Sequence, residues 1–131
     1  MQPLYITGLY AALLILIQVF LTFRVIGVRI RKGVVIGDGG EKTLHKRIRS
    51  HANFTETVPI TLIALALLES QAIAAWLLHA LGLALIIGRL LHPIGMENHA
   101  KLMFRRAGMI ITFTAMITAS LLLIAQFIKS L

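Results

Sequence analysis

The sequence has no cysteine and little charge. Its 131 residues include 13 lysines and arginines but only five aspartates and glutamates, and charged residues make up 14% of the chain. The absence of cysteine excludes disulfides, thiolate metal sites, iron–sulfur clusters and a catalytic cysteine belonging to the protein itself. The scarcity of charge excludes an ordinary soluble domain, which is about 25% charged. With a hydrophobic content of 58%, the chain is also too apolar to be disordered.

The sequence contains four long stretches without a charged residue. Residues 1–23 contain no charged side chain, and the same is true of residues 57–68, 70–88 and 107–128. A membrane-spanning helix needs about 20 apolar residues, so the stretch at 57–68 spans a membrane only if its helix begins upstream. We predict one all-α membrane domain over residues 1–131, a bundle of four transmembrane helices at about residues 3–27, 44–69, 71–92 and 104–128.

The basic residues lie on one side of these predicted spans. Twelve of the thirteen lysines and arginines fall between residues 24 and 49 or between residues 89 and 106, and the remaining one is Lys129. By the positive-inside rule, both basic loops are expected in the cytoplasm and both termini in the periplasm. The net charge of +8 therefore reports membrane topology and does not require a nucleic acid.

Two further features bear on how the helices pack. The connection at residues 69–71 is very short, so the second and third helices are expected to form an antiparallel hairpin. On the third helix Ala80, Ala84 and Gly88 recur every four residues. Small residues at this spacing allow close packing against a neighbouring helix.

A polar stripe on the second helix is the most informative segment. Arg49, Asn53 and Glu56 are spaced by four and three residues and therefore share one helical face, which Ile60 and Ile63 continue as an apolar face. A charged side chain within a membrane costs at least a few kcal/mol, and it normally faces a protein interior or a wet cavity. The stripe is either a set of structural ion pairs or the wall of a binding site.

Cationic side chains end or begin every predicted helix at the basic side. Two alternatives remain open for them. They are topology signals and contacts to anionic membrane lipids, or they form an anion pocket in which Glu56 is the single counter-charge. Such a pocket suits a small ligand with carboxylates and one ammonium group, because arginine binds carboxylates in a bidentate way. The candidate cations are Arg29, Arg31, Arg49, Arg89, His92, Arg105 and Arg106.

The motif Arg49-x-His51-x-Asn53-x-x-Glu56 on the second of four helices resembles the MAPEG family, the membrane-associated proteins of eicosanoid and glutathione metabolism. Three other stretches resemble the same family: residues 28–32, residues 88–92 and the pair Arg105-Arg106. The resemblance covers nearly the whole chain. The compact loops resemble the bacterial inner-membrane members.

The resemblance implies a homotrimer of four-helix bundles that binds glutathione between adjacent subunits, near the cytoplasmic side. It implies that Arg49, Asn53 and Glu56 contact glutathione, with Arg29 or Arg31 reaching in from the neighbouring chain. The remaining residues of the implied site are Arg89, His92 and Arg105 or Arg106.

The implied chemistry is activation of the glutathione thiol. A free thiol has a pKa of about 8.5, and a nearby guanidinium lowers it by favouring the thiolate. The family's activating arginine begins the fourth helix, and Arg105 and Arg106 both stand there. The thiolate would attack a lipophilic electrophile or a hydroperoxide from the bilayer, as in a glutathione transferase or peroxidase.

Two departures from the family pattern keep a second function open. Met96 stands where several catalytic members have a tyrosine that contacts glutathione, and Ala52 stands where the prostaglandin synthases have a basic residue. These departures disfavour leukotriene or prostaglandin synthesis. The alternative is a non-catalytic scaffold that binds a lipid or another ligand. A small multidrug-type transporter is disfavoured because its first helix would contain a carboxylate, and no histidine pair here has the spacing of a zinc motif.

Overall fold

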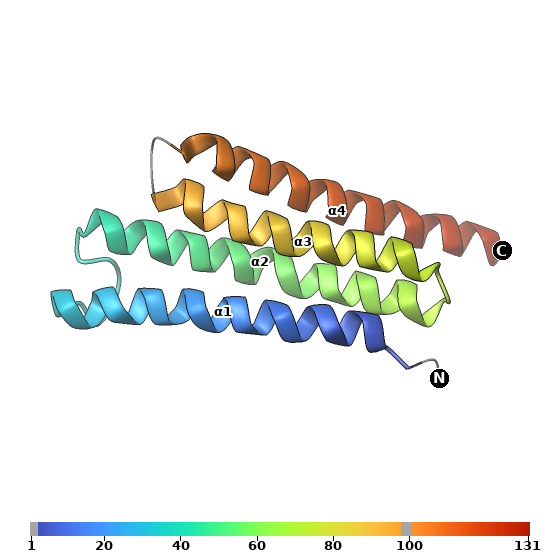
Figure 1. The fold of residues 1–131 in the computed structure, drawn as a ribbon, viewed down its shortest axis with the longest axis horizontal. Coiled ribbons are helices and arrows are strands. Elements are labelled where there is room, and N and C mark those ends of the chain that lie inside the picture. Colours follow the sequence, from blue (N-terminus) through green and yellow to red (C-terminus); the bar gives the residue numbers. More distant parts are fainter. Residues whose placement is uncertain (1–2, 98–100) are drawn as a thin grey trace.

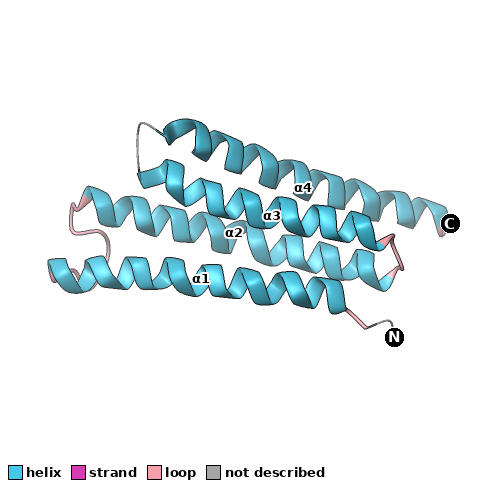
Figure 2. Ribbon diagram, viewed as in Figure 1, coloured by secondary structure: helices cyan, strands magenta, loops and turns pink. Residues whose placement is uncertain are grey.

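The computed structural model describes residues 3–97 and 101–131 and consists of four long helices (Figures 1 and 2). The helices are α1 (Tyr5–Lys32), α2 (Lys42–Ser70), α3 (Ala75–Glu97) and α4 (Leu102–Lys129). Each is long and apolar enough to cross a membrane, and the described residues contain no strand. The predicted all-α bundle of four spans is confirmed.

Neighbouring helices run antiparallel, and α2 and α3 lie between α1 and α4 (Figure 1). Among the described residues α1 has no contact with α4. We call the end where α1 and α3 finish the basic end and the opposite end, near both termini, the far end. This order places α2 and α3 at the centre of the bundle, so a buried side chain of either helix can reach two neighbouring helices.

Three predicted helix ends were misplaced by several residues. The helix α1 continues five residues beyond the predicted end, until Gly33 takes a left-handed conformation (φ +64°) and its N–H caps the carbonyls of Arg29 and Ile30. The helix α3 begins at Ala75 instead of residue 71, because Ala72 at φ +57° turns the chain between α2 and α3. It also continues through Pro93 to Glu97, where Gly95 packs directly on the backbone of α4.

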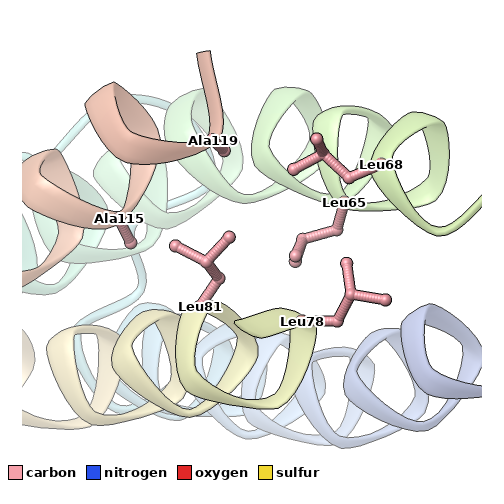
Figure 3. Packing of buried hydrophobic residues seen from close by; sticks show 6 residues of the cluster. All are labelled: Leu65, Leu68, Leu78, Leu81, Ala115 and Ala119. Atoms are coloured by element: carbon pink, nitrogen blue, oxygen red, sulfur yellow. The ribbon is translucent and has the colours of Figure 1, made fainter. Parts of the chain in front are cut away.

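The apolar core is thin and is built mainly from leucine. One cluster joins the central helices to α4 (Figure 3), and a second joins Leu14 and Leu21 of α1 to Phe54, Val58 and Leu85. Most other large apolar side chains are exposed. In the most apolar 18-residue stretch of α1, only 17% is buried inside the bundle. A continuous apolar surface of this extent fits a lipid environment. The first cluster comprises Leu65, Leu68, Leu78, Leu81, Ala115 and Ala119.

Glycines bring α3 and α4 into backbone contact. A Cβ atom on Gly88 would collide with Thr112 Oγ1 and lie 2.9 Å from the carbonyl oxygen of Gly108, and a Cβ on Gly108 would lie 2.7 Å from the carbonyl oxygen of Gly88. The predicted close packing is confirmed at Gly88. It is wrong for Ala80, which is exposed, because the contact surface of α3 follows Gly88 and Gly95 toward the basic end.

At the far end, a carboxylate of α2 caps α1. The first turn of α1 has no capping side chain of its own. Instead, the N–H of Ile6 donates to Glu69 Oε1 at 2.8 Å, and the N–H of Thr7 donates to Glu69 Oε2 at 2.7 Å. Glu69 is 8% exposed. An anion at a helix N-terminus satisfies unpaired N–H groups and interacts favourably with the helix dipole, so this contact sets the position of α1.

At the basic end, Glu97 of α3 pairs with Arg24 of α1 and lies 3.7 Å from Nε of Arg47 of α2. The connection between α1 and α2 is also ordered, with an ion pair between Lys32 and Glu41. Hydrogen bonds from the Gly40 N–H and then from the ring of His45 hold the pKa of Asp38 below its usual value. Polar contacts therefore tie α1 to α2 at the far end and join α1, α2 and α3 at the basic end.

We expect Glu69→Ala to lower the free energy of unfolding by about 1–3 kcal/mol, because two N–H groups near the start of α1 lose their acceptor. Unfolding in detergent micelles measures this change. The matched control is Glu41→Ala, which removes an exposed ion pair worth less than about 1 kcal/mol. Equal losses in the two variants would contradict the capping role.

We expect Gly88→Ala to destabilise the α3–α4 pair by about 1–3 kcal/mol, since the added methyl group overpacks a backbone contact. Gly27→Ala is the control, because a Cβ on Gly27 meets no atom within 4 Å and alanine favours helix more than glycine does. The same unfolding assay distinguishes them. A Gly88→Ala variant as stable as Gly27→Ala would show that the close approach is unimportant.

Candidate functional site

The candidate site is organised around a buried arginine at the centre of the bundle. Arg89 of α3 is 1% exposed and is the largest fully buried side chain among the described residues. Its Nε and Nη2 atoms lie 3.1 and 2.6 Å from Thr112 Oγ1 of α4. On the other side, Nη1 donates to the side-chain oxygen of Asn53 and lies 3.2 Å from Thr57 Oγ1, both of α2.

The acceptors around Arg89 are all neutral. They are hydroxyl, amide and carbonyl oxygens, with the sulfur of Met109 at 4.0 Å from Nη2. The chain has five carboxylates, and each has partners elsewhere: Asp38 with His45, Glu41 with Lys32, Glu56 with Arg49, Glu69 with α1, and Glu97 with Arg24 and Arg47. Among the described residues, Arg89 therefore has no anionic partner, and a buried cation in this situation is costly in a low dielectric.

The polar side chains of α2 are divided between the interior and the outer surface of the bundle. Asn53 turns inward and accepts from Arg89. Arg49 and Glu56 face outward, with side chains 52% and 56% exposed and 3.9 Å between Arg49 Nη2 and Glu56 Oε1. A pair this long and this exposed contributes little to stability. Of these three residues, only Asn53 contacts the buried cation.

His92 and Arg105 lie at the next level toward the basic end. His92 is 4% exposed, and its backbone fits against Gly108, where a Cβ would lie 2.8 Å from the His92 nitrogen. The backbone of Arg105 packs against Gly95, one turn beyond His92, where a Cβ atom would collide with it. The side chains of Arg105 and Arg106 are both exposed at the start of α4. The structure thus brings Arg105, rather than Arg106, near the buried part of the site.

The two candidate cations of α1 lie apart from this group. Arg29 donates from Nη1 to the carbonyl oxygen of Val35 at 3.1 Å and so holds the connection to α2. Arg31 is exposed, and no hydrogen bond or ion pair joins it to the described residues. Among the described residues, no hydrogen bond or ion pair joins either side chain to Arg89, Asn53 or His92.

Two residues of the site were missed from the sequence. Thr57 and Thr112 bracket the Arg89 guanidinium, and both are within spans and buried. Each hydroxyl also donates to a carbonyl one turn earlier, of Asn53 and Gly108 respectively. Threonine in an apolar helix is a weak signal, because this back-bonding satisfies it locally in any case.

We expect Thr112→Val to destabilise the protein by about 1–3 kcal/mol, since the guanidinium loses its principal acceptor while it remains buried. Thr114→Val, two residues along on the exposed side of α4, makes the same chemical change away from Arg89. Unfolding in detergent compares the two. If both variants are as stable as the wild type, Thr112 does not hold the guanidinium.

Comparison with known proteins covers the whole candidate site. The family model described as the MAPEG family matches residues 7–125. The chain is also similar to Inner membrane protein YecN of Escherichia coli K12, with 34% identity over 112 residues that cover 86% of this chain and 85% of the relative. The protein of the same name from Escherichia coli O6:H1 matches to the same extent. All candidate residues from Arg29 to Arg106 lie inside the matched region.

Proposed function

The chain belongs to the MAPEG family, and on this premise we propose that it is a glutathione-binding protein of the inner membrane that acts as a glutathione-dependent transferase or peroxidase. The observation that carries the proposal is the buried guanidinium of Arg89, which has only neutral acceptors. An anion bound nearby would compensate this charge. The relatives named as inner membrane proteins support the location.

Glutathione matches the charges of the site. It has two carboxylates, one ammonium group and a thiol. Arg49 can bind a carboxylate of glutathione in a bidentate way. Glu56, on the outer surface of α2, can accept a hydrogen bond from the ammonium group. Arg89 and Asn53 supply the inner wall. The ligand also brings the sulfur that the cysteine-free chain does not have.

The outward direction of Arg49 and Glu56 favours a site shared between subunits. Both side chains are about half exposed in one chain, so a ligand bound to them lies on the outer surface unless a neighbour covers it. In a homotrimer, as the family resemblance implies, a cation from α1 of the next chain would complete the site. Arg31 is the better candidate for this role, because Arg29 is already bonded to Val35.

The proposed chemistry begins with a thiolate held near Arg105. The guanidinium lowers the pKa of the ligand thiol by favouring its anion. In a transfer reaction the sulfur forms a bond to an electrophilic carbon as the leaving group departs. In a peroxidase reaction it attacks a lipid hydroperoxide, the O–O bond breaks to give an alcohol and a glutathione sulfenic acid, and a second glutathione forms the disulfide with release of water.

One residue of α3 supports the alternative function, a non-catalytic scaffold. Met96 is half-buried near the end of α3, and its thioether cannot donate a hydrogen bond to a thiolate. If no other donor replaces this contact, the site binds glutathione or a lipid without activating a thiol. The basic end is proposed to face the cytoplasm in either case.

Glutathione binding to the purified protein in detergent tests the proposal directly. We expect the wild type to bind, and we expect Arg49→Ala and Glu56→Ala to weaken binding at least about tenfold, as the loss of one charge-assisted hydrogen bond implies. Lys42→Ala removes an exposed cation at the same end and serves as the control. Absence of binding by the wild type would overturn the proposed ligand.

The ultraviolet absorbance of bound thiolate at neutral pH tests activation. Arg105→Ala should abolish this absorbance while glutathione still binds, and Arg106→Ala should retain it, because it is Arg105 whose backbone packs against Gly95, one turn beyond His92. A wild-type protein that binds glutathione without any thiolate signal would favour the scaffold function over catalysis.

A further inference from the structure

One neighbour of the buried Arg89 guanidinium is an oxidisable group, the thioether of Met109 on α4. The sulfur lies 4.0 Å from Nη2, and the same nitrogen donates to Thr112 Oγ1 at 2.6 Å. Nη2 has two N–H groups, and apart from Thr112 its contacts are long, to the Met109 sulfur and to the Gly108 carbonyl oxygen at 3.4 Å. One N–H of a buried cation is therefore weakly bonded beside a sulfur atom.

The sulfur of Met109 can be reached from the membrane, although Arg89 cannot. Arg89 is 1% exposed, whereas Met109 is half-buried. The next residue, Ile110, is 64% exposed, and Phe113, one turn further along α4, is 44% exposed. This side of α4 thus belongs to the apolar outer surface of the bundle. An apolar molecule in the bilayer can contact the sulfur without entering the bundle.

A thioether beside a hydrogen-bond donor is suited to the reduction of an organic hydroperoxide, R–O–O–H. The sulfur attacks the terminal oxygen, its electron pair forms the S–O bond, and the O–O bond breaks. The proton of the terminal oxygen passes to the departing oxygen, which leaves as the alcohol R–OH. The methionine is oxidised to a sulfoxide and the peroxide is reduced. Negative charge develops on the departing oxygen during this step, and a preorganised donor such as Nη2 stabilises it.

The guanidinium has two opposing effects on this reaction. A hydrogen bond to a sulfur lone pair slows the attack, but a thioether is a weak acceptor and the 4.0 Å contact is long. Stabilisation of the departing oxygen is the larger effect, because one such donor changes a reaction rate by about 10²–10³-fold in enzymes. The guanidinium of Arg89 therefore accelerates oxidation of the neighbouring sulfur.

We infer that Met109 is a modification site, oxidised to the sulfoxide by organic hydroperoxides from the bilayer, and that Arg89 directs the reaction to it. The product places a polar oxygen beside a cation that has no carboxylate partner among the described residues. The inference rests on the contact between Met109 and Arg89 and does not require glutathione. Its test is run without glutathione, so it can fail while the proposed function stands.

Mass spectrometry of the protein after brief exposure to cumene hydroperoxide in detergent tests the inference. Met116 is the internal reference, because it is half-buried on the same helix. It lines a cavity of about 290 Å³ in which none of the described lining residues is charged. We expect Met109 to be oxidised at least about tenfold faster than Met116, as a directed donor implies. Equal rates at the two methionines would overturn the inference.

Ile110→Met is the matched variant, since it adds a second sulfur beside Met109 at a more exposed position of α4. Fragment ions distinguish oxidation at the two positions. We expect the sulfur at position 110 to react about tenfold more slowly than Met109 despite its better access. Because Arg89 stays in place, this comparison does not depend on the folding of an Arg89 variant. Equal rates at positions 109 and 110 would show that exposure, and not Arg89, controls the oxidation.

Arg89→Leu removes the cation without adding a sulfur. We expect it to lower the oxidation rate of Met109 to that of Met116, while the rate of Met103, which is 80% exposed, stays unchanged. A Met109 that keeps its rate in Arg89→Leu would contradict the role of the guanidinium.

Discussion

The buried guanidinium of Arg89 is the interaction on which the rest of the structure depends. It sits on α3, the helix that α2 and α4 both cover, and it draws an amide and two hydroxyls from those helices toward one point. The glycines of α3 and α4 bring the backbones close enough for Thr112 to reach it. Because no carboxylate of the chain compensates its charge, the bundle keeps a positive potential at its centre.

Burying the uncompensated charge of Arg89 lowers the stability of the bundle, but it leaves a positive charge that can attract an anion. The thin leucine core, the capping of α1 by Glu69 and the ion pairs of Glu97 hold the helices in register. These contacts do not involve Arg89, but the stability they contribute offsets the free-energy cost of burying its charge. The pair of Arg49 and Glu56 lies on the outer surface of the same helix, where the proposed ligand and a neighbouring chain would reach it.

The sequence predicted the number, type and order of the helices, because an uncharged apolar run of about 20 residues is typical of a membrane-spanning helix. It misplaced the end of α1, since Arg29 and Lys32 remain helical beyond the apolar run, and the end of α3, since Pro93 lies inside the helix. Helical spacing put Asn53 and Glu56 on one face, whereas in the structure Asn53 turns inward to Arg89 and Glu56 faces outward. It could not show that Arg89 is buried against Thr57 and Thr112. The 3.6-residue period shows which residues share a face of one helix, but it does not show which residues of two helices lie opposite each other.

The most direct test of the account replaces Arg89 with methionine and measures the thermal unfolding midpoint in detergent with and without saturating glutathione. Methionine keeps the volume and removes the charge, while Thr57 and Thr112 retain their hydrogen bonds to the Asn53 and Gly108 carbonyls. We predict that Arg89→Met is at least as stable as the wild type without ligand and that glutathione raises the midpoint of the wild type alone. A variant that is less stable, yet is stabilised by glutathione to the same degree as the wild type, would contradict the account.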